Sequence, residues 1–239
     1  MVDGTGDRGR RVRWEEYWND RGMLSGQDYF KQVGRTFHGA NYSEREMCVL
    51  VTRILTFLEA SREKTLLELA CGNGMLTSRI APYFKHVTAV DFSVPLIEVA
   101  RTQFACGNVE YAVGDARHLN VVGARFDCAL IYFAFQYFTP SDARKVFRRL
   151  AGLVKPGGRV LLGDVADRDR IWNFYRGLTG RLKYARDEIR GQPIIGYWWR
   201  PSELLKAATE LQWKLSVHYQ HAEMPNHYFR YDAVLETGQ

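Results

Sequence analysis

The sequence predicts an α/β fold in which seven strands form one mostly parallel sheet flanked by helices. Two observations lead to this prediction. Short apolar runs alternate along the chain with segments whose apolar residues have helical spacing, which is the rhythm of βαβ units. A turn of small residues at 70–74 follows the first predicted strand, Thr65–Leu69, and opens a helix, as in a nucleotide-binding βαβ unit.

Each element is supported by a local pattern. The aromatic residues of a short helix, Trp14–Asn19, fall on a single face, and the helix Ser43–Ala60 begins with a capping pair, Ser43 and Glu46. A further helix begins at Pro140. Strands are indicated by apolar runs and, near the end of the chain, by two alternating segments. The predicted strands are Thr65–Leu69, Val87–Asp91, Val109–Gly114, Phe126–Tyr132, Arg159–Val165, Trp213–Tyr219 and Tyr228–Glu236.

The composition is that of a globular protein. The chain has 239 residues, of which 46% are hydrophobic, enough for one α/β domain with a full core. No apolar run approaches the ~18 residues that a membrane span needs, so we expect no membrane partner. Residues 1–13 are polar, lack the apolar centre of a signal peptide and are expected to be a flexible tail. The scattered cysteines favour a reduced, cytoplasmic protein.

The net charge is +6, which fits nucleic acid, an anionic small substrate or no charged partner. The basic residues do not form one long block, so nucleic acid is the less favoured partner. No group of residues has credible metal-ligand spacing, and no metal is expected. The oligomeric state is left open between monomer and homodimer.

The turn at 70–74 indicates which ligand the sheet holds. Gly72 and Gly74 let a ligand approach the main chain, but Thr77 stands where a dinucleotide site has its third glycine. Glu68, just before the turn, would repel a phosphate and attract a cation. S-adenosylmethionine carries an ammonium and a sulfonium and no phosphate, so it suits this turn better than NAD.

The run Glu68–Gly74, ELACGNG, resembles the first motif of class I S-adenosylmethionine-dependent methyltransferases, departing from it at Ala70, where the family has glycine. The resemblance implies a Rossmann-like sheet of strand order 3-2-1-4-5-7-6 with an antiparallel last strand. It also implies S-adenosyl-L-methionine as cofactor, bound by Glu68, Ala70, Gly72 and Gly74.

Later strand ends fit the same family. Asp91 ends the second strand, where an acid accepts hydrogen bonds from ribose hydroxyls, and Phe92 would cover the adenine. Asp115 and Ala116 resemble the position that contacts the adenine amino group. The loop after the fourth strand borders cofactor and acceptor in the family. The resemblance therefore implies that Ile131 and Tyr132 contact the cofactor and that Phe133 and Gln136 contact the substrate. Tyr137 is expected on the acceptor side.

Two further segments of the single domain, 14–239, are expected to enclose the site. Residues 14–60 resemble the helical lid of small-molecule methyltransferases, where Arg35 would bind the cofactor carboxylate and Tyr29 would form a pocket wall. Residues 167–200, with a net charge of +4 and many aromatics, form a cap insertion in which Trp172 and Tyr197 would contact the acceptor. A solvated helix or an RNA-binding segment are the alternatives for this insertion.

A hydroxyl acceptor would benefit from a general base, for which His221 and His227 are the candidates, whereas an amine acceptor needs only to be neutral. The sequence thus predicts an enzyme that methylates an oxygen or nitrogen of a small molecule, such as a sugar or natural-product intermediate. An RNA methyltransferase is the first alternative. A non-catalytic or NAD-binding module on the same fold is the second.

Overall fold

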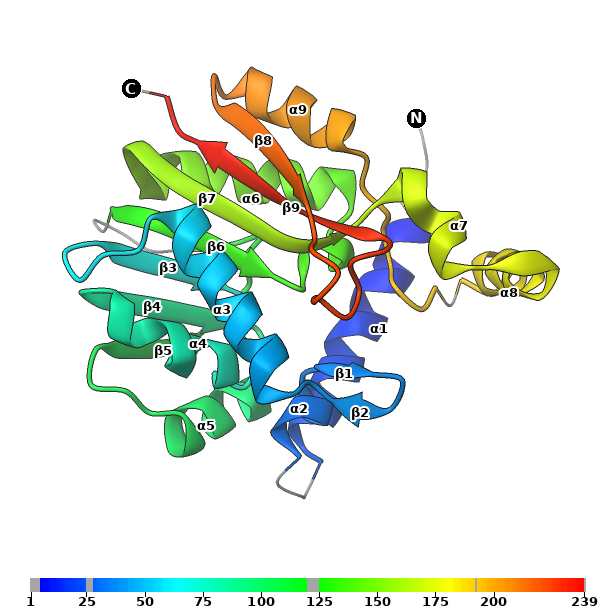
Figure 1. Ribbon diagram of the computed structural model, residues 1–239, viewed down its shortest axis with the longest axis horizontal. Coiled ribbons are helices and arrows are strands. Elements are labelled where there is room, and N and C mark those ends of the chain that lie inside the picture. Colours follow the sequence, from blue (N-terminus) through cyan, green and yellow to red (C-terminus); the bar gives the residue numbers. More distant parts are fainter. Residues whose placement is uncertain (1–4, 25–27, 120–124, 192, 239) are drawn as a thin grey trace.

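The computed structural model describes residues 5–24, 28–119, 125–191 and 193–238, with side chains from residue 14 onward. At its centre lies a seven-stranded sheet of order β5-β4-β3-β6-β7-β9-β8, in which β9 runs antiparallel to both neighbours (Figure 1). The predicted order and the antiparallel last strand are therefore confirmed. The strands are β3 Thr65–Leu69, β4 His86–Asp91, β5 Val109–Val113, β6 Phe126–Tyr132, β7 Val154–Ala166, β8 Lys214–Tyr219 and β9 Arg230–Glu236.

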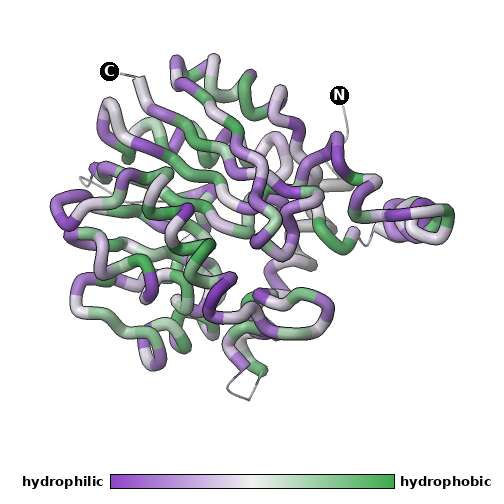
Figure 2. Tube along the Cα trace, in the orientation of Figure 1, coloured by the Kyte–Doolittle hydropathy of each residue, from purple (hydrophilic) through white to green (hydrophobic). Residues whose placement is uncertain are grey.

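Helices cover both faces of the sheet, and each face has its own apolar core. α3, α4 and α5 pack on one face, and α6 and α9 pack on the other (Figure 1). Figure 2 shows hydrophobic residues gathered along the central strands. The helices are α1 Thr5–Gly22, α2 Tyr29–Gln32, α3 Glu44–Leu58, α4 Met75–Ile80, α5 Val94–Gln103, α6 Pro140–Leu153, α7 Ile171–Phe174, α8 Gly177–Ile189 and α9 Pro201–Glu210.

Local sequence sets where these elements begin. The predicted capping box of α3 is present: the Ser43 hydroxyl accepts from the Glu46 backbone N–H, and the Glu46 carboxylate accepts from that of Ser43. α6 has a second capping box, built from Thr139 and Asp142, with Pro140 in its first turn. β6 lies between two parallel neighbours and is apolar on both faces, as expected for a central strand.

The N-terminal segment differs from the expectation. One helix, α1, runs from Thr5 to Gly22, where the sequence predicted a loose tail over 1–13 and a short helix from Trp14. The prediction depended on apolar periodicity, and residues 5–13 contain a single aliphatic residue, so the pattern carried no signal there. Residues 1–4 lie outside the described range. A two-stranded hairpin, β1 Thr36–Phe37 and β2 Ala40–Asn41, follows α2.

Between β7 and α9 the chain leaves the sheet and forms a short 3₁₀ turn, Arg168–Arg170, then α7 and α8. Six buried residues anchor this segment to the body in a third apolar cluster. α8 itself projects away from the rest of the molecule (Figure 1). Among the described helices, none is both long and apolar enough to cross a membrane. The cluster comprises Ala166, Ile171, Tyr175, Ile195, Trp198 and Phe229.

The pairing of β6 with β7 requires glycine at one position. Gly163 lies opposite Tyr132, and a Cβ at residue 163 would overlap the buried Tyr132 ring. We expect Gly163→Ala to lower the free energy of unfolding by about 1–3 kcal/mol, because the ring has no room to move. Chemical denaturation followed by far-UV circular dichroism measures this loss.

Gly152→Ala, in α6, is the matched control, because a Cβ there meets nothing within 4 Å. Alanine should stabilise that helix by up to about 1 kcal/mol. Equal unfolding midpoints for the two variants would contradict the close approach of β6 and β7.

Candidate active site at the carboxyl edge of the sheet

Two adjoining pockets open at the carboxyl ends of β3, β4 and β6. The space inside the Asp115 lobe, with the solvent at its mouth included, is about 820 Å³, and the same space in the Arg35 lobe is about 620 Å³. They form one cleft, because five residues line both lobes. Parallel sheets bind ligands at this edge, where the strand order reverses between β3 and β6. The shared residues are Ala70, Asp91, Phe92, Ala134 and Tyr137.

The glycine turn forms the floor of the cleft. Ala70, Gly72 and Gly74 all have positive φ, at 58°, 59° and 79°. Ala70, the departure from the family motif, therefore adopts a left-handed conformation that glycine would adopt at lower cost. Gly74 does not line either lobe. A Cβ there would meet the Tyr111 hydroxyl at 2.8 Å and Ala100 at 2.9 Å, so this glycine allows α4 to pack closely.

Asp91 joins the tips of β3 and β4. Its Oδ2 accepts from the backbone N–H of Gly72, and its Oδ1 from that of Ser93, both at 2.9 Å. Burial raises the pKa of Asp91 to about 6, although these two hydrogen bonds oppose the shift. The carboxylate is thus held rigidly, with its charged form disfavoured until a further donor arrives.

Glu68 and Arg35 both line the second lobe. Glu68 is 2% exposed, and burial raises its pKa to about 7 against the opposing influence of nearby Thr77 and Arg35. Arg35 is 6% exposed and lies over the Phe133 ring, with its Cζ 4.1 Å from the ring centroid. Among the described residues, the Nε and Nη1 of Arg35 and the Oε2 of Glu68 have no hydrogen-bond partner. Such buried polar atoms are costly unless a ligand satisfies them.

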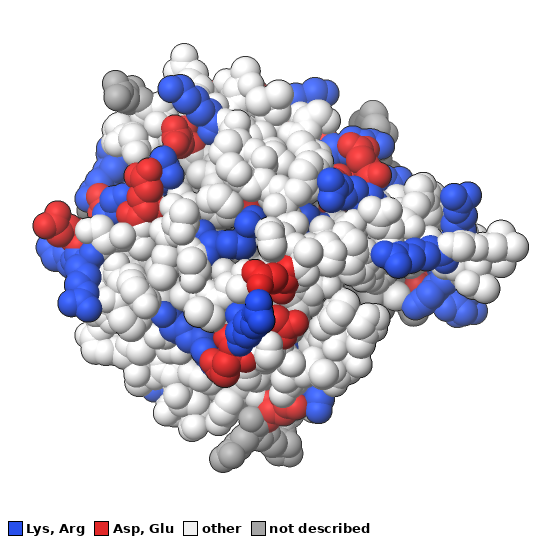
Figure 3. Space-filling model, viewed as in Figure 1, with Lys and Arg blue, Asp and Glu red and all other residues white. Residues whose placement is uncertain are grey.

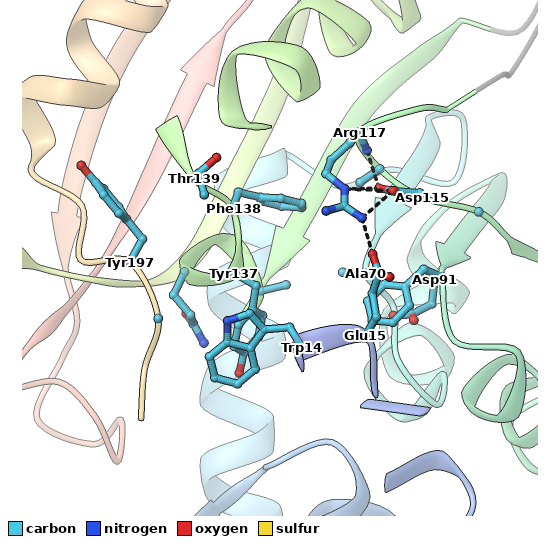
Figure 4. Close-up of a pocket in the computed structure, with 16 residues that line it drawn as sticks. Trp14, Glu15, Ala70, Asp91, Asp115, Arg117, Tyr137, Phe138, Thr139 and Tyr197 are labelled. Atoms are coloured by element: carbon cyan, nitrogen blue, oxygen red, sulfur yellow. Dashed lines mark hydrogen bonds and ion pairs between the residues drawn. The ribbon is translucent and has the colours of Figure 1, made fainter. Parts of the chain in front are cut away.

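One ion pair joins α1 to the wall of the Asp115 lobe. Arg117 donates to Asp115 at 2.8 Å, and its Nη2 lies 2.6 Å from Oε1 of Glu15, so α1 is tied to the loop after β5 (Figure 4). Burial raises the pKa of Asp115, but the hydrogen bonds from Arg117 outweigh it and hold that pKa below its usual value.

An aromatic group stands between the lobes. Tyr137 packs against Trp14, with ring centroids 4.6 Å apart (Figure 4). It also packs against Trp18, with ring centroids 5.6 Å apart. Burial raises the pKa of the Tyr137 hydroxyl, so at neutral pH it is a hydrogen-bond donor rather than a base.

The structure brings most of the predicted site residues together. The cofactor candidates that line the cleft are Arg35, Glu68, Ala70, Gly72, Asp91, Phe92, Asp115, Ala116 and Tyr132. Of the substrate candidates, Phe133, Gln136 and Tyr197 line it.

Four other candidates lie elsewhere. Ile131 is fully buried in the core and Gly74 packs against α5. The Tyr29 hydroxyl donates to Gln103, and its ring packs on Phe104, outside both lobes. Trp172 packs on Tyr184 in the projecting segment.

The two histidines proposed as bases are also not brought to the cleft. The His221 side chain is 70% exposed, with Nδ1 3.7 Å from Glu223, which in turn pairs with Arg45. His227 is bonded through Nδ1 to the Met224 carbonyl oxygen at 2.8 Å. Met224, which lies between these histidines in the chain, is buried in the core and anchors the β8–β9 connection there, and neither imidazole lines the cleft.

Among the residues that line the cleft, sequence reasoning assigned no role in the site to Trp14, Trp18, Glu15 and Arg117. Trp14 and Trp18 gave a signal, since the helical spacing places them on one face, but no role in the site was predicted from that face. Glu15 and Arg117 gave none, because their pairing joins residues 102 positions apart. Among the described residues, no group of three or more His, Cys, Asp or Glu side chains could hold a metal ion.

The strand order, the glycine turn and the acids at successive strand ends together define the class I methyltransferase fold. Consistent with this, residues 66–158 match the family model described as "Methyltransferase domain". The predicted resemblance to class I S-adenosylmethionine-dependent methyltransferases is thereby confirmed, and the chain carries a methyltransferase domain.

Curated proteins similar to this chain are methyltransferases, and the name of one of them states a tRNA substrate. The chain is 34% identical over 125 residues to an uncharacterized methyltransferase of Mycobacterium bovis, covering 49% of this chain and 62% of that protein. It is 27% identical over 199 residues to the tRNA N(3)-methylcytidine methyltransferase trm140 of Schizosaccharomyces pombe, covering 73% and 61%. The chain thus spans about three fifths of these curated relatives.

Among solved structures, the N-methyltransferase NodS from Bradyrhizobium japonicum, in complex with S-adenosylhomocysteine, is similar in fold. The TM-score is 0.63 at 14% identity, covering 94% of this chain and 98% of that one.

The raised pKa of Glu68 predicts a pH-dependent cost to stability. The folded state keeps the proton up to about pH 7, whereas the unfolded chain loses it near pH 4.5. The folded state therefore binds more protons between these values, and stability falls as pH rises through them. We expect Glu68→Gln, which cannot ionise, to gain up to about 3 kcal/mol relative to wild type between pH 4.5 and 7.

Denaturant unfolding at several pH values measures this difference. Glu98→Gln is the control, because Glu98 is exposed on α5 and the substitution should leave the pH profile unchanged. A constant difference between Glu68→Gln and wild type across the range would contradict a protonated Glu68.

Proposed function

We propose that this protein is an S-adenosylmethionine-dependent methyltransferase that methylates an oxygen or nitrogen of a small molecule. The observation that carries the proposal is that one lobe is lined by both Arg35 and Glu68, a buried cation and a buried acid with polar atoms that lack hydrogen-bond partners. An amino-acid moiety has the complementary groups, a carboxylate and an ammonium.

The rest of the cleft fits the remainder of that cofactor. Asp91, at the junction of the lobes, would accept from the ribose hydroxyls, and Phe92 would cover the adenine beside Ala116. Asp115 is engaged by Arg117, so its contact with the adenine would use whatever acceptor capacity Arg117 leaves. A dinucleotide fits less well, because its pyrophosphate would approach Glu68.

When bound, S-adenosylmethionine would supply a methyl group already activated by a sulfonium. This chain then has to hold the cofactor, orient the acceptor in line and exclude water. Arg35 and Glu68 would fix one end of the cofactor, Asp91 its middle, and α1 would cover the cleft through Trp14 and Glu15.

The acceptor is expected on the Tyr197 side of the cleft. Tyr137, Thr139 and Tyr197 line this part of the wall, opposite Asp115 and Arg117 (Figure 4). Gln136 lines the same lobe. Gln136 is held in place, since it donates to the Phe133 carbonyl at 3.0 Å and accepts from Arg230 at 3.1 Å. Tyr137, kept protonated, would donate a hydrogen bond to the acceptor. An enclosed wall of this kind favours a small molecule.

An RNA acceptor is the second candidate function. The similarity to a tRNA methyltransferase and the net charge of +4 over residues 167–200 favour it. The affinity for RNA would fall steeply as salt rises, because phosphate contacts release counterions. An enzyme that acts only on a small molecule would not bind the RNA. Filter binding of a labelled RNA at 50 and 200 mM salt separates the two.

The cytoplasmic location and the choice between monomer and homodimer stay predictions.

Isothermal calorimetry tests the cofactor. We expect the protein to bind S-adenosylhomocysteine and to show no heat with NAD. Asp91→Ala and Arg35→Met should each weaken S-adenosylhomocysteine binding at least about tenfold, since each removes charge-assisted hydrogen bonds.

Glu110→Ala serves as the control acid, on the neighbouring strand and outside the cleft, and should bind normally. Thermal unfolding midpoints establish that the variants are folded. Unchanged affinity in folded Asp91→Ala and Arg35→Met would contradict the cofactor assignment, and equal binding of NAD would replace it with a dinucleotide module.

A further inference from the structure

Helix α8 has one face turned toward the body of the protein. Gly180 packs against the backbone of Tyr175, and Tyr184 packs on the rings of Tyr175 and Trp172. Asp187, one turn further along the same face, is buried. This inner face is short and largely aromatic, and it accounts for how α8 is held while the helix projects from the molecule (Figure 1).

The opposite face of α8 is apolar and exposed. Leu178 is 74% exposed, Leu182 62% and Ile189 87%, and Ala185 between them is also exposed. At 3.6 residues per turn, these four positions fall within about 60° of the helix circumference, on the side facing away from Tyr184. Scattered exposed leucines are ordinary, but a continuous stripe along a projecting helix marks an interaction site.

Basic residues border the stripe on both sides. Arg181 lies along one edge, and Arg186 and Arg190 along the other, all exposed. Arg181 also lies over the ring of Trp172, which is itself 46% exposed beside the stripe. Figure 3 shows Lys and Arg side chains alternating with uncharged ones over this projecting end. Residues 176–190 carry five basic and two acidic side chains.

We propose that α8 docks this protein on an anionic lipid membrane, lying in the plane of the surface with Leu178, Leu182 and Ile189 among the acyl chains. An apolar stripe edged by arginines, with a tryptophan at its margin, is the pattern of an interfacial helix. The basic edges would meet lipid headgroups of opposite charge. The sequence predicted no membrane partner because only a spanning segment was considered; α8 lies on the membrane and does not cross it.

Other occupants fit less well. A second copy of this chain would bring two such helices side by side, and their excess of five basic over two acidic side chains each would repel. An RNA backbone would pair with the arginines but would leave the leucines exposed to water or bury them against phosphate. A membrane with acidic headgroups satisfies the stripe and its edges together.

Vesicle co-sedimentation of the full chain tests this proposal. We expect binding to vesicles of phosphatidylcholine with 30% phosphatidylglycerol (~1:2 anionic to neutral lipid), much weaker binding to phosphatidylcholine alone, and a decline with salt. The double variant Leu182→Ser and Ile189→Ser should lose at least about tenfold in partitioning, because each substitution removes an inserted side chain. Arg181→Gln with Arg186→Gln should lose roughly fivefold per charge on anionic vesicles only.

Matched controls lie elsewhere on the surface. Tyr83→Ser with Leu205→Ser removes two apolar side chains that are 50% and 52% exposed, and Arg148→Gln with Arg149→Gln removes two exposed charges from α6. Both controls should partition like wild type. All variants should retain wild-type affinity for S-adenosylhomocysteine, so this test is independent of the proposed methyl transfer.

The proposal is overturned if wild type does not sediment with anionic vesicles, or if the α8 variants sediment as their controls do. It is also overturned if analytical ultracentrifugation shows a dimer, or filter binding an RNA complex, that the α8 variants abolish while vesicle binding is absent.

Discussion

The cleft depends on one buried carboxylate. Asp91 ends β4 and accepts from the amide of Gly72, which follows β3, so two neighbouring strand tips are fastened by a charge-assisted hydrogen bond. The turn between them has positive φ at Ala70, Gly72 and Gly74 and lacks the regular ladder of bonds that would hold it. The same carboxylate lines both lobes. The group that shapes the turn is therefore also the group best placed to bind a ligand across it.

The glycine turn also holds the N-terminal segment in place. Asn73 donates to the carbonyl of Tyr29 at 3.0 Å and to the side chain of Gln32 at 2.9 Å. Gln32 in turn donates to the carbonyl of Gly22 at the end of α1. Arg35 follows Gln32 closely in the chain. The hydrogen bonds that begin at the turn therefore also set where its guanidinium lies in the cleft. Floor and lid are one hydrogen-bonded unit, and a shift in either would move the other.

The sequence was sufficient for the sheet and for one half of the cleft. Strands such as β6 are recognisable because burial on both faces leaves an unbroken apolar run, and Glu68 and Asp91 sit at strand ends whose positions the topology dictates. Contacts between distant segments were out of reach. The pairing of Glu15 with Arg117 and the orientation of His221 are set by how α1 and the β8–β9 connection pack, and local pattern contains no information about that.

The cleft also shows why binding and stability are opposed in this fold. Arg35 and Glu68 are withdrawn from water without full hydrogen bonding, and burial raises the pKa of Glu68 and of Asp91. Each group makes the unliganded protein less stable than an apolar replacement would. A ligand that carries both a carboxylate and a cation would supply the missing partners of Arg35 and Glu68 together. Its binding would stabilise the folded protein and offset the cost of burying these groups. Polar atoms that fit poorly into the folded chain alone are thus the features that specify what it binds.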